Sequence, residues 1–397
     1  GPGGGGAMGH AAPIRMPGRE EGRPMNRYLW IVAPFLLLLV LSACSGEPDT
    51  VAVSVEPTPS SSRALLVLVG AGEKTTAINV YFPRSVRIRA GDTVTWKMNT
   101  QADPQTVTFS DQRPEDDVIP VPSGGSGDSL FGGGSSSSML NPNLLYPTRR
   151  EDDPVEAWRG AGYVNSGIMF PKPHLPPGFP QIDTFSLIFD KPGVYPYFCG
   201  IHDFHKGVVV VEPQTALDVP GQKEIDEQGE SEMEYYKELT GGLRVVLTSD
   251  RIMDKEAGPG GSSVYLVSAG MGPPEAELTE FIPRRLKINK GDTVVWASSR
   301  WHSVVFNPDG AFPPMYTPVE GDDGELLMVI NHQVLLPVKA GEDFTDEGLY
   351  SSGLIGYGTR PGGIGYSLTF AVTGTFRYSC PIHPGMVGTI DVQDGDS

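Results

Sequence analysis

The chain has 397 residues, which is more than one hydrophobic core usually organises, so we expect more than one domain. Its formal net charge of −18 argues against a nucleic-acid binder, which needs a basic face to neutralise phosphates. Glycine (50 residues) and proline (37 residues) separate short apolar runs that are rich in Val, Ile, Tyr and Phe. This pattern is typical of an all-β protein.

The N-terminal region has the features of an export signal. A positive charge precedes an apolar run over 28–41, which is shorter than the roughly 20 residues needed to span a bilayer. The run ends in LSAC, which resembles the bacterial lipobox, in which the cysteine (Cys44) is lipidated; a plain cleaved signal or an uncleaved anchor is the alternative. The sequence therefore predicts a leader (1–43) and a flexible stalk (44–62) anchored by lipid to a bacterial membrane, facing the periplasm or the cell exterior.

An internal duplication organises the rest of the sequence. The segment FPRSVRIRAGDTVTW (82–96) matches IPRRLKINKGDTVVW (282–296), and FSLIFDKPGVYPYFCGIH (185–202) parallels YSLTFAVTGTFRYSCPIH (366–383). Each copy contains alternating strands separated by turn residues, a pattern that favours antiparallel β-sandwiches. The chain is therefore expected to contain two copies of one β-sandwich unit.

The duplication sets the predicted domain boundaries. Domain 1 is expected over 63–213 and domain 2 over 243–393, each a Greek-key β-sandwich with a long loop insertion in its middle. The acidic segment 214–242 is interpreted as a solvated linker, with docking of a partner as the alternative; it could form a short helix, although Gly229 weakens the helical pattern.

Four residues of domain 2 have the types and the spacing of a blue-copper site. Cys380 points to the same side of its strand as the core aromatics, His383 follows three residues later and Met386 six residues later. Far upstream, strand alternation turns His302 inward. Two histidines, a cysteine thiolate and a weak axial methionine are the ligands of a blue-copper centre. Zinc is the poorer fit, because structural zinc sites rarely include a thioether.

Domain 1 carries an altered version of this ligand pattern. In the alignment, Gln105 takes the place of the upstream histidine, Cys199 and His202 are retained, and His205 stands where domain 2 has its methionine. Asp103, on the same strand face as Gln105, is a substitute ligand. The pattern itself leaves open a Cys/His/His set with an axial glutamine and a degenerate, metal-free domain. We favour an occupied site, because the loss of one histidine is matched by the gain of another.

These motifs resemble the cupredoxin family. GDTVVW, HSVVF and GTFRYSCPIHPGM are similar to plastocyanin-like signatures, and the short Cys-x2-His-x2-Met loop is most similar to the amicyanin type. The domain 1 set resembles nitrosocyanin, a cupredoxin with a red copper site, and this resemblance implies a third interpretation, a more tetragonal copper centre. The resemblance implies two tandem cupredoxin domains, with a type 1 (blue) copper in domain 2 and a second, variant copper in domain 1. The chain departs from the pattern at Ser303, where plastocyanin-like proteins usually have Asn beside the upstream histidine.

The resemblance further implies an electron carrier outside the cytoplasm, rather than an enzyme, whose redox partner is a cytochrome or an oxidase. The acidic balance of the chain favours a basic surface on that partner. Tandem cupredoxin domains also build nitrite reductases and multicopper oxidases, but the catalytic coppers of those enzymes need His-x-His pairs or a His-Cys dipeptide, which this sequence lacks. The alternatives are a copper-dependent redox reaction at the domain 1 site and a single-copper protein with a degenerate domain 1.

Overall fold

The computed structural model describes residues 61–111, 118–120, 138–149, 153–155, 157–247, 255–321, 324–356, 365–383 and 385–395. The predicted leader, the stalk up to residue 60 and the lipidation candidate Cys44 lie outside the described residues. Within these ranges, none of the helices combines the length and the apolar character that crossing a membrane requires.

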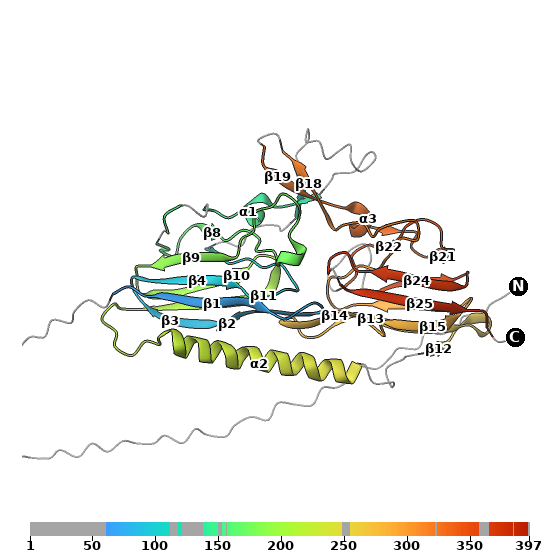
Figure 1. The fold of residues 1–397 in the computed structure, drawn as a ribbon, viewed down its shortest axis with the longest axis horizontal. Helices are drawn as coiled ribbons and strands as arrows, with labels where there is room; N and C mark the ends of the chain where they lie inside the picture. Colours follow the sequence, from blue (N-terminus) through green and yellow to red (C-terminus); the bar gives the residue numbers. More distant parts are fainter. Residues whose placement is uncertain are drawn as a thin grey trace, which may run out of the picture. The chain divides into compact units, whose positions relative to one another are not determined.

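Domain 1 is a sandwich of two β-sheets, and the strands that dominate the chain confirm the predicted all-β class (Figure 1). One sheet contains, in spatial order, β2 (Thr76–Phe82), β1 (Ala64–Ala71), β4 (Asp92–Met98) and β9 (Thr184–Phe189). The other contains β3 (Ser85–Arg89), β11 (His202–Glu212), β10 (Gly193–Cys199), β5 (Thr108–Ser110) and β8 (Tyr163–Asn165).

Domain 2 repeats this arrangement. Its first sheet contains β14 (Ala276–Ile282), β13 (Ser263–Met271), β16 (Thr293–Ala297), β23 (Gly365–Phe370) and β21 (Asp343–Phe344), with β12 (Lys255–Ala257) also paired to β13. Its second sheet contains β15 (Arg285–Asn289), β25 (Val387–Gln393), β24 (Gly374–Ser379), β17 (Val305–Phe306), β22 (Tyr350–Ser352) and β20 (Pro337–Val338).

Each sandwich encloses an aromatic core beneath its predicted cysteine ligand. In domain 1 the ring of Trp96 lies edge-on to Tyr197 with centroids 5.1 Å apart, and in domain 2 Trp296 lies edge-on to Tyr378 at 5.4 Å. Each tyrosine precedes a cysteine by two residues, so the strand period of two turns the cysteine toward the same interior. The cysteines, Cys199 and Cys380, are accordingly buried.

The two sandwiches share one continuous ten-stranded sheet, because β14 pairs antiparallel with β2. Backbone hydrogen bonds cross this seam from the Asn79 N–H to the Glu275 carbonyl oxygen (2.8 Å) and from the Thr279 N–H to the Thr75 carbonyl oxygen (3.0 Å). The duplication predicted two copies of one unit, and strand pairing between them is an additional feature of the fold.

Helix α2 (Gln222–Leu247) contacts β2 and β14 on both sides of the seam (Figure 1). The sequence interpretation of a solvated linker that could form a short helix is wrong here, since α2 is 26 residues long and its Ile225 is 2% exposed in the domain 1 core. The sequence interpretation treated Gly229 as a residue that weakens the helix, yet it lies inside α2. A Cβ atom at this position would lie 3.1 Å from the carbonyl carbon of Phe82, so the glycine allows the helix to approach the strand closely.

The middle insertions of the two domains pack together. Strands β18 (Tyr316–Glu320) and β19 (Leu326–Ile330) of domain 2 form a four-stranded sheet with β7 (Ser138–Leu140) and β6 (Val118–Pro120) of domain 1. The short helices α1 (Pro142–Leu145) and α3 (His332–Leu335) follow β7 and β19, respectively. A buried apolar cluster joins the two insertions; its members include Leu145, Phe170, Phe179, Met328 and Ile330.

Candidate metal centres

The structure brings three predicted ligands of domain 2 together. The Sγ atom of Cys380 lies 3.6 Å from His383 Nδ1 and 3.8 Å from His302 Nδ1, and the three ligand atoms all lie within 4.8 Å of one another. Cys380 directly follows β24, and a tight turn returns His383 to it. His302 comes from the segment before β17, which a backbone bridge to Ile355 holds in place. The arrangement can hold a soft or borderline metal ion.

Met386 lies in the same buried cluster as Cys380 and is 1% exposed. Its backbone N–H donates to the His383 carbonyl oxygen (2.9 Å), and its own carbonyl accepts from the Cys380 N–H (2.9 Å). The loop is therefore closed on itself, with the methionine on its buried side. Ligation by the Met386 thioether stays a prediction.

Hydrogen bonds orient the ligands of domain 2. The Ser303 backbone N–H donates to Cys380 Sγ at 3.3 Å, so this contact does not depend on the asparagine that the sequence lacks at this position. Glu277 Oε1 accepts from His302 Nε2 at 2.8 Å, which directs Nδ1 of the ring toward the cysteine. Gly270 makes room for this pair, since a Cβ there would lie 2.2 Å from His302 Nε2. Sequence reasoning missed Glu277, although a glutamate within the strand AELTEFI is an unusual residue in a buried position.

The structure also brings together the predicted ligands of domain 1. The ligand atoms of Cys199, His202 and His205 all lie within 4.8 Å of one another. The Oε1 atom of Gln105 stands among them, 2.8 Å from His205 Nδ1, 3.2 Å from His202 Nδ1 and 3.6 Å from Cys199 Sγ. The Thr106 N–H donates to Cys199 Sγ at 3.3 Å, as Ser303 does to Cys380 in domain 2. The four residues thus form one buried group of sulfur, nitrogen and oxygen donors.

The amide of Gln105 is held in one orientation. Its Nε2 donates to Asn79 Oδ1 at 2.6 Å, so its Oε1 faces the sulfur and the two imidazoles. The ring of His205 lies against Tyr81, with centroids 3.7 Å apart, and His205 Nε2 is buried with no hydrogen-bond partner among the described residues. This imidazole is therefore held by packing, with its Nδ1 directed toward Gln105.

Electrostatic interactions shift the pKa values of three titratable residues of the domain 1 group in different directions. Burial and the nearby His202 hold the pKa of His205 well below its usual range, so its imidazole is neutral near pH 7. Burial acts to raise the pKa of the Cys199 thiol, but the charge and hydrogen bond of His202 outweigh it, and the pKa is lowered. Burial acts to lower the pKa of His202, but the interactions with Cys199 and Asp103 outweigh it, and the pKa of His202 is raised. A neutral imidazole and an easily formed thiolate are the forms that bind metals.

Asp103 lies on the outer side of the domain 1 group. Its Oδ2 is 4.0 Å from His202 Nε2, the ring nitrogen that points away from Cys199, and Asn79 Nδ2 donates to the same oxygen at 3.3 Å. Gln105, and not Asp103, therefore faces the cysteine. The remaining described histidines, His174 and His332, belong to neither group of ligand atoms.

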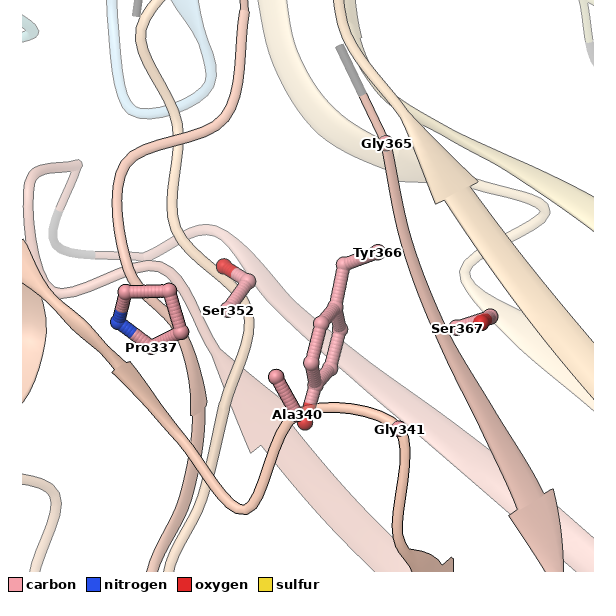
Figure 2. A pocket seen from close by; sticks show the side chains of 7 residues that line it. All are labelled: Pro337, Ala340, Gly341, Ser352, Gly365, Tyr366 and Ser367. Carbon is pink, nitrogen blue, oxygen red and sulfur yellow. The ribbon is translucent and has the colours of Figure 1, made fainter. Parts of the chain in front are cut away.

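A separate pocket of about 230 Å³ lies in domain 2, and none of the predicted ligands lines it (Figure 2). Its lining is mostly backbone, hydroxyl and small apolar groups from Pro337, Ala340, Gly341, Ser352, Gly365, Tyr366 and Ser367. None of these side chains is a strong metal ligand. Among the described residues, the clusters of three or more His, Cys, Asp or Glu ligand atoms that could hold a metal ion are the two buried groups.

Comparisons with protein-family models and with curated protein sequences find no match. Among solved structures, the matches include a copper(I) form of a methionine-to-glutamine mutant of amicyanin (TM-score 0.20), a copper(I) form of a methionine-to-alanine mutant (0.20) and an oxidised methionine-to-lysine mutant (0.19). Each is 21% identical to this chain over 38% of its length, and each match covers 82% of the amicyanin chain.

Proposed function

We propose that this protein binds two copper ions and transfers electrons. In domain 2 a type 1 copper would be held by the ligands His302, Cys380, His383 and Met386. In domain 1 a variant copper would be held by the ligands Cys199, His202, His205 and Gln105. A thiolate suits Cu(I) and imidazoles suit Cu(II), so both oxidation states are accommodated by one set of ligands.

The observation that carries the proposal is the convergence of a buried sulfur and two Nδ1 atoms within 4.8 Å in each domain. Backbone N–H groups of Thr106 and Ser303 already point at the two sulfurs, and hydrogen bonds fix the Gln105 amide and the His302 ring. Ligands held in this way need little rearrangement when a metal changes its oxidation state, a property that suits electron transfer.

The position of Gln105 supports an occupied domain 1 site over a degenerate one. Its oxygen is directed at three metal-binding atoms, and a second polar residue, Asn79, is buried to hold its amide. Burying polar groups has a desolvation cost that a purely structural core would avoid by apolar packing. Two imidazoles, a thiol and an amide oxygen are together a reasonable donor set for copper.

A copper titration of the purified wild-type protein and of two variants tests the proposal. Wild type should bind two copper ions, Cys380→Ser should lose the intense sulfur-to-copper visible band of domain 2, and Cys199→Ser should retain it. Electron paramagnetic resonance of Cys380→Ser should then show one remaining copper with a large hyperfine splitting. Survival of the domain 2 band in Cys380→Ser would refute the domain 2 assignment, and the absence of copper from that variant would refute the domain 1 assignment.

We further propose that the protein is exported and lipid-anchored through Cys44, and that its partner is a cytochrome or oxidase with a basic docking surface. The apolar run followed by LSAC and the net charge of −18 support these assignments. Cys44→Ala should move the protein from the membrane to the soluble fraction. The rate of electron transfer to a basic cytochrome should fall as salt is raised, and a rate independent of salt would contradict an electrostatic encounter.

A further inference from the structure

Asp103 stands between the two candidate metal centres. Its Oδ1 lies 3.8 Å from His383 Nε2 of domain 2, and its Oδ2 lies 4.0 Å from His202 Nε2 of domain 1. Both are outer nitrogens, because the same two rings direct Nδ1 toward Cys380 and Cys199. One carboxylate therefore approaches a predicted ligand of each centre from the side that faces away from the metal.

The carboxylate of Asp103 is buried and held on several sides. It is 5% exposed, and it accepts a hydrogen bond from Asn79, the residue that also fixes Gln105. On the domain 2 side, Asp103 interacts electrostatically with Tyr316 of β18: burial and the negative charge of Asp103 raise the pKa of this tyrosine to about 12. Elements of both domains thus surround a single carboxylate, in a setting where solvent screens its charge weakly.

A second contact connects the centres through Arg300. Its guanidinium carbon lies 5.8 Å from the ring centroid of Phe204, which stands between two predicted ligands in the domain 1 sequence. The Nε of Arg300 is 3.9 Å from Glu277 Oε2, and the other oxygen of Glu277 accepts from His302 Nε2. Both predicted histidine ligands of domain 2 therefore connect to domain 1 through side chains that contact their outer nitrogens.

The position of Asp103 also affects access to domain 2. The His383 side chain is only 15% exposed, and its outer nitrogen faces the carboxylate of the neighbouring domain. The route from His383 through the Asp103 carboxylate to His202 is therefore a short path for electrons between the two domains, because His202 Nε2 approaches the other oxygen of the same carboxylate.

We propose that Asp103 is a positioning residue shared by the two centres: its negative charge, 3.8 Å from the outer nitrogen of His383 and 4.0 Å from that of His202, couples copper binding and electron transfer at one centre to the other. This inference rests on the proposed function, that both centres bind copper. When one electron passes between the centres, one copper goes from Cu(I) to Cu(II), the other goes from Cu(II) to Cu(I), and no bond or proton is exchanged. Because a nearby negative charge stabilises the more positive oxidation state, Asp103 lowers the reduction potential of both centres.

The test compares Asp103→Asn with Asp190→Asn, whose exposed carboxylate pairs with Arg159 at 3.1 Å. In the copper-free protein, the nitrogen resonances of His202 Nε2 and His383 Nε2 should both shift in Asp103→Asn and stay in place in the control. With copper loaded, both reduction potentials should rise in Asp103→Asn, and the rate of intramolecular electron transfer after pulse reduction should fall severalfold. The control should match wild type in every measurement.

The outcomes separate this proposal from the assignment of copper. Binding of fewer than two copper ions would refute the proposed function, and the nitrogen resonances of the copper-free protein would still decide whether Asp103 contacts both rings. Two bound coppers with a shift at one centre, or at neither, would overturn the shared role. If Asp103→Asn does not fold, the domain 2 potential is compared between wild type and Cys199→Ser; coupling requires the two values to differ, and equal values would overturn it.

Discussion

Which ring nitrogen of a histidine faces a metal depends on what its other nitrogen contacts. His302 has its Nε2 bonded to Glu277, while the outer nitrogens of His202 and His383 face Asp103. His205 differs, because its Nε2 is buried without a partner and the Tyr81 ring holds its imidazole by packing. Of the four predicted imidazole ligands, His302 is thus oriented by a hydrogen bond to a carboxylate, which makes a ring nitrogen a stronger donor toward a metal.

Replacing Glu277 with glutamine should weaken copper binding at domain 2 by about 10-fold to 100-fold, the range typical of residues that orient metal ligands. The amide keeps the size of the side chain but loses the charge that holds His302 Nε2–H, so Nδ1 is less firmly directed at the site. Competition with a copper chelator measures the effect in the Cys199→Ser background. The control is Glu280→Gln on the same strand, whose carboxylate contacts Arg244 and Thr75. Equal affinities for both variants would contradict the role of Glu277.

The side of a strand to which each side chain points could be predicted from the sequence. The partners that a side chain meets on other segments could not. Strand period placed Cys380 with the core tyrosine and His302 inward, as the structure shows. Glu277 and Asp103 reach their histidines from segments 25 and 280 residues away in the chain. No local pattern encodes such contacts, because the first depends on how the segments of domain 2 pack and the second on how the two units pair. From the sequence, Asp103 was predicted only as a substitute metal ligand of domain 1, whereas in the structure it also lies near His383 of domain 2.

At the scale of secondary structure, α2 shows how tertiary packing overrides local propensity. Its glycine and its many acidic residues predicted a solvated segment, yet its apolar positions cover the seam between β2 and β14. Partly buried Met233, Tyr236 and Leu239 pack on one side of the seam, and Leu243 packs on the other. Such packing, rather than propensity, supplies most of the stability of a helix in a protein.

Truncating Ile225 to alanine should lower the free energy of unfolding by about 2–4 kcal/mol, because the side chain is 2% exposed in the domain 1 core and its removal leaves a cavity. Val245→Ala is the matched control on the same helix, since Val245 is 72% exposed and its truncation should change stability by less than about 0.5 kcal/mol. Urea unfolding followed by far-ultraviolet circular dichroism measures both. A small effect of Ile225→Ala would mean that α2 is a detached linker, as the sequence suggested.

At the scale of the whole molecule, the two sandwiches are joined by a continuous sheet, by α2 and by the sheet of the insertions. Side chains strengthen the β2–β14 seam: Arg244 pairs with Glu280 at 2.6 Å, and Thr75 donates to the same carboxylate at 2.7 Å. The sequence predicted the two units through their repeated motifs. It could not predict the pairing of β2 with β14, because the sequence of each strand is equally compatible with an unpaired edge strand of its own sandwich.

This continuity leads us to expect that copper at one centre stabilises both halves of the molecule. A ligand that binds only the folded state stabilises it by about 4 kcal/mol at 1,000 times its dissociation constant. Because unfolding either sandwich would expose the seam, the gain at domain 1 should be shared by domain 2. The Cys380→Ser variant, loaded with copper at domain 1 alone, should therefore unfold in one transition at a raised temperature. Fluorescence variants that retain Trp96 or Trp296 as the sole tryptophan report the two halves separately, since each ring is fully buried in its own core. If copper raised the midpoint seen by Trp96 and left that of Trp296 unchanged, the halves would be energetically independent and the shared sheet would transmit no stability between them.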